Sequence, residues 1–129
     1  MLTAILLLAL ASPPAAPPAR PVQVLDFAAL TPAGLDALDG RRVTLRIERW
    51  SHPDELGRWW VIDCYGPVRD DGLHRTAWLY SGQPKGEVMI VTGRLRVIHY
   101  RAREDFEAFT EVRLLGGVVE RIVKPWDGD

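Results

Sequence analysis

Two short stretches of the chain bring aromatic and basic side chains close together. RWWVIDCYG, over residues 58–66, begins with an arginine and two adjacent tryptophans, and TAWLYS, over residues 76–81, carries a tryptophan and a tyrosine. Aromatic rings stack on bases or sugars, and guanidinium groups make planar two-point contacts with phosphate or carboxylate. The chemistry that these residue types favour is therefore binding. The candidate ligand-binding residues are Trp59, Trp78, Tyr80, Arg46, Arg58 and Arg75.

The alternation of side chains along a strand assigns a face to each tryptophan of the first stretch. Neighbouring strand residues point to opposite faces, so Trp59 and Trp60 cannot both belong to the core of a one-sided sheet. Placing Trp60, Ile62 and Cys64 inward keeps the carboxylate of Asp63 in water. This assignment predicts that Trp59 points outward.

The second stretch completes the same pattern. If Ala77 and Leu79 point inward, Trp78 and Tyr80 point outward, beside Trp59 when the two stretches pair as a hairpin. Two alternatives stay open. The opposite register would bury the three aromatic residues in the core of the domain, and a partner chain or the N-terminal segment could cover them as an interface.

The elements that position these residues are mainly strands. From Val43 onward, apolar and polar residues alternate with a period of two, as in RVTLRIE, and glycine-rich or proline-containing turns separate the later runs. Gly93, in the middle of a long apolar run, predicts a sharp bend or bulge. Five strands with no amphipathic helices between them predict an all-β fold, a small five-stranded antiparallel Greek-key barrel.

A short helical segment is expected before the first strand, over residues 26–40. Thr31 suits a helix cap, Pro32 suits a first helical position, and Leu35 and Leu38 recur at helical spacing. The sequence therefore predicts a helical lead-in to the barrel.

The order LDGRRVTLRIERW, RWWVIDCYG, TAWLYSG, GEVMIVTGRLRVIHY and EVRLLGGVVE resembles the oligonucleotide/oligosaccharide-binding (OB) fold, as found in small exported bacterial domains of the tRNA-anticodon-binding-like group. The resemblance implies a ligand surface on the outer face of the second and third strands, and no catalytic residues. SGQPKGE is too short for the helix that many OB domains insert. One end of the barrel is then expected to be covered by Phe27, Leu30, Leu35 and Leu38. An SH3-like small barrel is the alternative fold.

The N-terminus indicates export. The apolar run over residues 2–11 is too short to span a bilayer and ends in the small-x-small pattern Ala9-Leu10-Ala11, which predicts a signal peptide over residues 1–11. Five of the ten residues from 12 to 21 are proline, which predicts a stiff linker over 12–25. The domain is expected over 26–126 and a tail over 127–129. The expected location is periplasmic or secreted, with no stable membrane span after cleavage; an uncleaved N-terminal anchor is the alternative.

Charge and cysteine content exclude several function classes. The formal net charge is -1, so the overall field does not attract phosphate polymers or anionic membranes, and nucleic-acid binding would need a local patch. The single cysteine, Cys64, cannot form an intramolecular disulfide and is expected to be a small buried hydrophobe.

No motif predicts catalysis, a cofactor or a metal site. His52, His74 and His99 occur singly, without the spacing of zinc ligands, and no phosphate-binding glycine loop or nucleophile motif is present. We therefore expect no enzyme activity. The sequence predicts an exported OB-like binding or interaction module whose partner is an envelope protein, an oligosaccharide or a single-stranded nucleic acid. The alternative functions are a single-stranded nucleic-acid-binding domain and a structural protein-interaction domain of the cell envelope.

Overall fold

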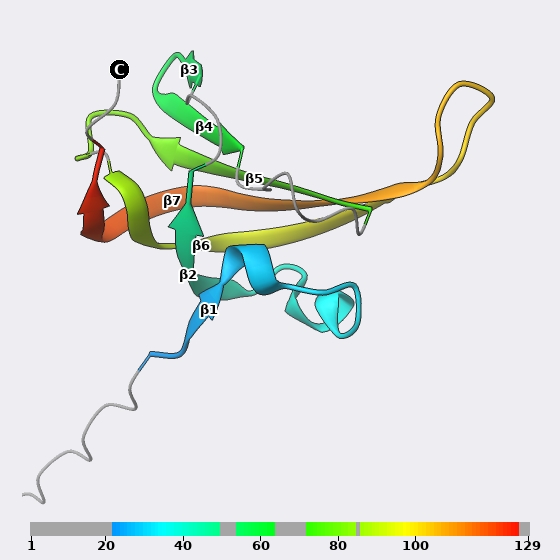
Figure 1. Cartoon of the computed structure of the whole chain (residues 1–129), viewed down its shortest axis with the longest axis horizontal. Helices are drawn as coiled ribbons and strands as arrows, with labels where there is room; N and C mark the ends of the chain where they lie inside the picture. Colours follow the sequence, from blue (N-terminus) through cyan, green and yellow to red (C-terminus); the bar gives the residue numbers. More distant parts are fainter. Residues whose placement is uncertain (1–21, 50–53, 64–71, 85, 127–129) are drawn as a thin grey trace, which may run out of the picture.

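The chain folds into one curved sheet with almost no helix (Figure 1). The computed structural model describes residues 22–49, 54–63, 72–84 and 86–126. The strands are β1 (Val24–Asp26), β2 (Arg42–Glu48), β3 (Asp54–Leu56), β4 (Trp59–Asp63), β5 (Leu73–Tyr80), β6 (Gly86–Tyr100) and β7 (Phe109–Pro125), and two 3-10 helices are η1 (Phe27–Ala29) and η2 (Leu35–Leu38).

The seven strands lie in the order β1-β2-β6-β7-β5-β4-β3. The β1–β2 and β5–β7 pairs are parallel, and the other neighbours are antiparallel. The predicted all-β class is therefore confirmed. The two longest strands, β6 and β7, form the middle of the sheet, and their hairpin extends beyond the other strands (Figure 1).

The prediction of a closed five-stranded barrel was wrong. Among the described residues, no backbone pairing joins the β1–β2 end of the sheet to the β4–β3 end. The edge of β2 is instead occupied by β1, where Leu25 lies opposite Leu45, and the edge of β4 is occupied by β3. Because a strand has only two hydrogen-bonding edges, these short strands take the positions that closure of the barrel would need.

The predicted helical lead-in was also wrong. The segment contains two single turns of 3-10 helix in place of an α-helix, and Val24 and Leu25, which were expected in the linker, belong to β1. Gly34 adopts φ 76° just before η2 and Gly40 adopts φ 78° just after it. These left-handed positions limit the helical run to one turn, which is too short for propagation to offset nucleation.

The lead-in nevertheless covers the core as its apolar residues predict. Phe27 and Leu35 are fully buried, and Leu30 and Leu38 pack against them. We call the concave side of the sheet that carries this cluster the inner face, and the other side the outer face. Inner-face residues alternate along each strand and include Leu45, Ile47, Ile62, Ala77, Leu79, Met89, Val91, Leu95, Val97, Val112 and Leu114.

Glycine marks the place where the long strands bend. The register between β6 and β7 shifts between Thr92 and Arg94, so the predicted bulge at Gly93 is confirmed. A Cβ atom on Gly93 would lie 2.7 Å from the carbonyl oxygen of Leu115. The two strands therefore approach each other there more closely than any side chain would allow.

Several predictions fall outside the described residues. They are the signal peptide over 1–11, most of the linker over 12–25, the strand position and burial of Cys64, and the tail over 127–129. Within the part of the chain that the structure describes, no helix has the length and apolar character needed to cross a membrane.

Candidate binding face

The β4–β5 hairpin presents an aromatic pair on the outer face. The antiparallel register places Trp59 directly opposite Tyr80, and Val61 opposite Trp78. The rings of Trp59 and Tyr80 are stacked, with centroids 4.4 Å apart and an interplanar angle of 26°. Trp59 and Trp78 are half-buried, whereas 43% of the Tyr80 surface is exposed. We call Trp59, Trp78 and Tyr80 the aromatic patch.

The inner face of the same hairpin belongs to the core. Ile62, Ala77 and Leu79 are buried, and Trp60 packs against the core cluster. The two adjacent tryptophans thus lie on opposite faces, because the pleat alternates at every residue.

The end of β5 is fixed by one side chain from the following turn. The Gln83 Nε2 group donates to the carbonyl oxygens of Tyr80, at 2.8 Å, and Gly117, at 3.0 Å. Its Oε1 atom accepts a hydrogen bond from the Val119 backbone N–H at 2.7 Å. Gln83 therefore ties Tyr80 to β7 and restricts the motion of the exposed end of the aromatic patch.

Arg58 lies next to the Trp59–Tyr80 end of this patch. It occupies the turn between β3 and β4, is exposed, and its carbonyl oxygen accepts a hydrogen bond from Ser81 at 2.6 Å. This bond joins the beginning of β4 to the end of β5. Arg58 is therefore held beside the Trp59–Tyr80 stack with its backbone fixed.

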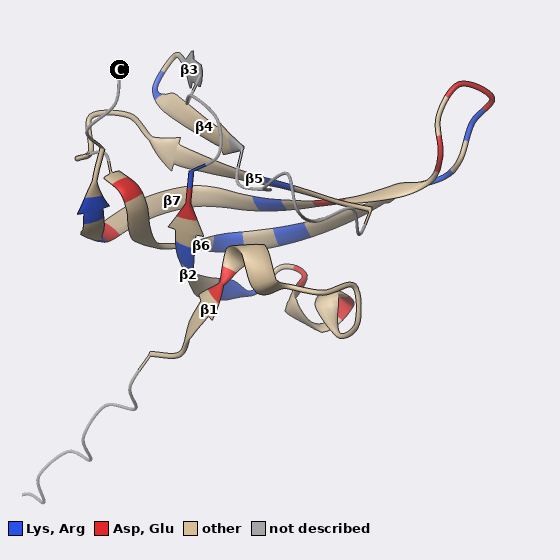
Figure 2. Cartoon of the chain, in the orientation of Figure 1, with Lys and Arg blue, Asp and Glu red and all other residues tan. Residues whose placement is uncertain are grey.

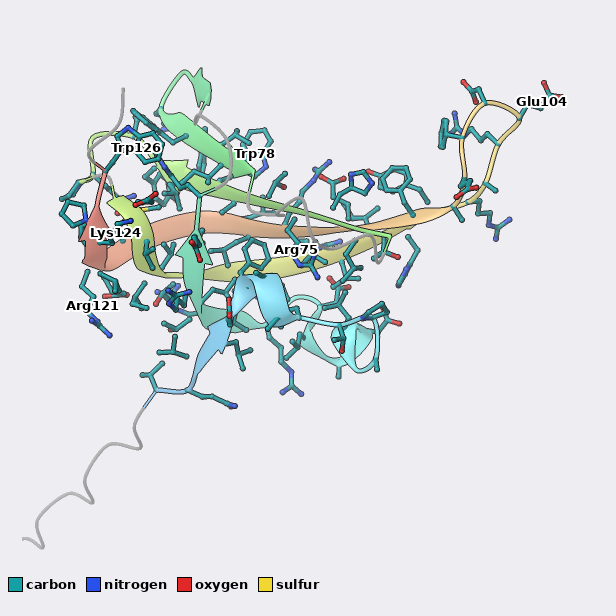
Figure 3. The ribbon with its side chains drawn as sticks, viewed as in Figure 1. Arg75, Trp78, Glu104, Arg121, Lys124 and Trp126 are labelled. Carbon is teal, nitrogen blue, oxygen red and sulfur yellow. The ribbon has the colours of Figure 1, made fainter. Side chains whose placement is uncertain are left out.

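Arg75 does not lie on the outer face, contrary to its prediction as a ligand-binding residue. It is fully buried on the inner face, and its Nη2 atom donates to the carbonyl oxygen of Leu30 at 2.7 Å. Figure 3 shows Arg75 between β5 and the lead-in. The alternation rule that points Ala77 and Leu79 inward also applies to Arg75, because residues two apart share a face.

Arg46 is separated from the aromatic patch. It lies on β2, and both β6 and β7 intervene between β2 and β5 in the sheet. Its side chain is 41% exposed and its guanidinium lies 3.8 Å from the Glu48 carboxylate. The structure therefore brings together Trp59, Trp78, Tyr80 and Arg58, and places Arg46 and Arg75 elsewhere.

A group of arginines on the outer face was missed as a site. Arg42 lies directly opposite Arg94, and Arg96 lies directly opposite Arg113. We call these four residues the arginine cluster; Figure 2 shows basic bands side by side on β6 and β7. Arg113 also lies opposite Thr76, which shares the outer face with Trp78, so the cluster and the aromatic patch occupy the same side of the sheet.

Neighbouring groups orient the cluster. The Arg94 Nη1 group donates to the Gly40 carbonyl oxygen at 2.6 Å, and Arg96 lies 3.5 Å from Asp39. The Glu111 carboxylate accepts hydrogen bonds from Nε and Nη2 of Arg113, the second at 3.0 Å. Two guanidiniums thus have a carboxylate neighbour, and the third is held by a carbonyl.

The charge state of Glu111 follows from these contacts. Burial acts to raise the pKa of Glu111, but hydrogen bonds from Arg113 and Tyr100 and the charges of Arg113 and His74 outweigh it, so the pKa lies below its ordinary value. The hydrogen bond to Glu111 is the main reason that the pKa of Arg113 is raised. Both groups are ionised at neutral pH.

The pattern Arg94-Leu95-Arg96 carried the signal for the cluster. Two arginines around a buried leucine must share the outer face of a strand. The cross-strand partners Arg42 and Arg113 could not be found in this way, because their positions depend on pairings between strands that are distant in the sequence.

A second group of polar residues lies at the edge of the lead-in. The His99 Nε2 atom is 2.6 Å from the Asp36 carboxylate, and its Nδ1 atom is 2.9 Å from the Thr110 hydroxyl. Carboxylate, imidazole and hydroxyl are the groups of a nucleophilic triad. Here, however, the Thr110 backbone N–H donates to the carbonyl oxygen of Gly72 at 3.0 Å, so it is not available to the oxyanion of a substrate bound beside that hydroxyl. The contact instead ties η2 to the β6–β7 hairpin.

Within the described ranges, no group of three or more histidine, cysteine, aspartate or glutamate side chains could hold a metal ion. Comparison of the chain with protein-family models, with curated proteins and with solved structures finds no match. The candidate functional surface is therefore the outer face, with its aromatic patch and its arginine cluster.

Proposed function

We propose that the protein is a non-catalytic binding module with an OB-like strand arrangement, which contacts an oligomeric ligand through the aromatic patch. The observation that carries this proposal is the Trp59–Tyr80 stack on the outer face, with Trp78 on the same face. Stacking on exposed aromatic rings is a sequence-tolerant way to hold bases or sugars.

The strand order supports the OB resemblance. Counted from β2, the five strands β2, β4, β5, β6 and β7 have the neighbour order first-fourth-fifth-third-second, and only the third and fifth run parallel. An OB barrel has this order and adds a pairing between its first two strands, which β1 and β3 replace here. In that arrangement β4 and β5 are the second and third strands, whose outer face carries the ligand.

The position of the rings supports a contact surface that is already formed. Trp59 is held by its stack on Tyr80, and Tyr80 is anchored by Gln83 through its backbone. Side chains that are ordered before binding lose less conformational entropy when a ligand arrives. Arg58, which is exposed beside the pair, can orient a charged group of the ligand.

A tryptophan-fluorescence titration of the full-length protein tests the proposal. The probes are single-stranded oligonucleotides and neutral and acidic oligosaccharides. We expect a saturable change with one class of probe, with an affinity at least about fivefold weaker in Tyr80→Ala, since losing one stacking partner costs about 1–3 kcal/mol. Val123→Ala, which removes an exposed apolar side chain of β7, is the matched control and should bind normally. Equal binding by wild type and Tyr80→Ala would refute the proposal.

Single-stranded nucleic acid is the second candidate ligand, and the arginine cluster favours it. Phosphate groups of a nucleic acid lying along β6 could pair with Arg94 and Arg96 while its bases reach the aromatic patch. Affinity for an oligonucleotide should then fall steeply with salt, and Arg94→Ala should reduce that salt slope by about one. A neutral sugar ligand would show neither effect.

We also propose that the protein is exported, on the basis of the apolar segment over residues 2–11. The intact mass of the protein recovered from the envelope or culture fluid of an expressing bacterium tests this. A measured mass equal to that of a chain beginning at Ser12 supports cleavage after Ala11. The full-length mass in the membrane fraction would support the uncleaved anchor, and recovery only from the cytosol would refute export.

A further inference from the structure

The β6–β7 hairpin ends in a turn that lies away from the rest of the sheet. We call Glu104 and Asp105, at this turn, the acidic tip. β5 accompanies β7 only from Thr110 onward, so residues 100–109 form an arm without a third strand among the described residues. Arg103 donates its N–H to the Phe106 carbonyl oxygen at 2.9 Å, which places Glu104 and Asp105 at the apex of a tight turn. Figure 3 shows Glu104 at the far end of this arm.

The tip offers both charge and apolar surface to a partner. Residues 101–108 are all exposed, and the apex carries carboxylates at Glu104 and Asp105, followed by Glu107. Phe106 is 40% exposed, and the guanidinium of Arg103 lies over its ring, 5.5 Å from the centroid. Arg103 is thereby turned toward Phe106, and the apex itself is acidic.

The arginine cluster is a matching surface on the outer face of the same sheet. Like charges placed directly opposite each other on neighbouring strands destabilise a sheet, and the cluster contains two such pairs. Asp39 and Glu111 supply two negative charges beside four arginines, so a net positive charge remains. Leu115, which lies opposite Arg94 and is 37% exposed, adds an apolar surface within the cluster.

The arm cannot bring its acidic tip to the arginine cluster of its own chain. Arg96 and Glu104 are joined by a strand that runs straight to Tyr100 and rises about 3.3 Å per residue, so Tyr100 already lies about 13 Å beyond Arg96. Figure 2 shows the acidic tip at the end of the arm and the basic bands in the middle of the sheet. Only the tip of another molecule can reach the cluster.

We propose that copies of this chain associate head to tail, with the acidic tip of one copy on the arginine cluster of the next. Glu104 and Asp105 contact the arginine pair farther from the arm, which is Arg42 and Arg94. Phe106 packs on Leu115. The two surfaces differ, and in an open chain of copies one tip and one cluster always stay unoccupied at the ends. The assembly therefore grows with concentration and does not stop at a symmetric dimer.

Sedimentation velocity of the full-length protein tests this at about 0.02 M and about 0.5 M salt, because exposed charges are screened at the higher value. We expect the average mass to rise steadily with protein concentration at low salt and to return to the monomer at high salt. The tip variant Glu104→Arg with Asp105→Arg, and the cluster variant Arg42→Glu with Arg94→Glu, should each remain monomeric. Arg121→Glu removes an exposed arginine outside the cluster and should assemble like the wild type.

Mixing the two variants gives the sharpest result. The tip variant keeps an intact cluster and the cluster variant keeps an intact tip, so an equal mixture should form dimers and nothing larger. A chain carrying all four substitutions should assemble again. This recovery would show that the two variants fail to assemble because charge complementarity is lost, and not because they misfold. Tyr80→Ala should assemble normally, so failure of the ligand proposal leaves this test unaffected.

Three results would overturn the proposal. They are a wild-type protein that is monomeric at both salt concentrations, assembly that neither variant changes, and a mixture in which both variants remain monomeric. A monomeric wild type whose oligonucleotide binding is lost in the cluster variant would assign the arginine cluster to a nucleic-acid ligand instead.

Discussion

The inner and outer faces of the sheet use the same residue types in opposite ways. On the inner face, Arg75 is fully buried and its guanidinium holds the backbone of the lead-in through Leu30. On the outer face, Arg94 is exposed and is steadied by a single carbonyl oxygen. The tryptophans divide in the same way, with Trp60 against the core and Trp59 in the aromatic patch. The side of the sheet, more than the residue type, determines whether a side chain supports the fold or is available to a ligand.

The largest expected effect lies on the inner face. Arg75→Ala removes a charge-assisted hydrogen bond to the lead-in and leaves a cavity, so the free energy of unfolding should fall by about 3 kcal/mol. Arg94→Ala on the outer face should cost less than about 0.5 kcal/mol. Urea denaturation measures both. Equal losses of unfolding free energy in the two variants would contradict a structural role for Arg75 that Arg94 lacks.

The next largest effect concerns the bulge that bends the inner face. The Cβ atom of Gly93→Ala would lie 2.7 Å from the Leu115 carbonyl oxygen and 2.9 Å from Cγ of Leu114. Because a backbone atom is involved, β6 and β7 must move apart, and we expect a loss of about 2 kcal/mol in the free energy of unfolding. A thermal melt within a degree of the wild type would show that the strands are not held this closely.

A smaller effect is expected on the outer face, in the Trp59–Tyr80 stack. A double-mutant cycle with Trp59→Ala and Tyr80→Ala should give a coupling of about 1 kcal/mol, the usual value for a stacked aromatic pair. The cycle with Trp59→Ala and the exposed Val123→Ala provides the control and should give no coupling. Additive losses in both cycles would mean that the rings do not support each other in solution.

The smallest effect is a pH dependence at the edge of the arginine cluster. The pKa of Glu111 is lower in the folded protein than its ordinary value of 4.5, so its contribution to stability is present above that value and is lost as the pH falls through the folded-state pKa. Glu111→Gln should therefore lose less stability than the wild type on acidification below pH 4.5. Parallel stability curves for the two proteins would contradict the ionised contact with Arg113.

Strand alternation predicted the faces of several described residues correctly. The inward positions of Ile62, Ala77 and Leu79 are confirmed, as is the bulge at Gly93. Arg75, which was expected to bind a ligand, follows the same alternation as Ala77 and lies on the inner face despite its charge. A buried arginine needs specific partners, and one of them here is the Leu30 carbonyl oxygen in the lead-in, which no periodicity reveals.

The open sheet and the cross-strand members of the arginine cluster, Arg42 and Arg113, could not be predicted, because both depend on long-range pairing. β1 contains three residues, of which Val24 and Leu25 belong to the segment expected as linker, yet it pairs with β2 and takes its free edge. The predicted function, export and partners stay predictions, since they depend on ligands and on residues that the structure does not describe.

The most direct test of the ligand proposal compares the two adjacent tryptophans. In a two-dimensional NMR spectrum that correlates indole N–H protons with nitrogen, the signals of Trp59 and Trp60 are followed while a single-stranded oligonucleotide, or an acidic or neutral oligosaccharide, is added. We predict that with one of these probes the Trp59 and Trp78 signals shift in a saturable manner while the Trp60 signal does not. No shift with any probe, or a shift of Trp60 without Trp59, would contradict the assignment of the outer aromatic patch as the binding surface.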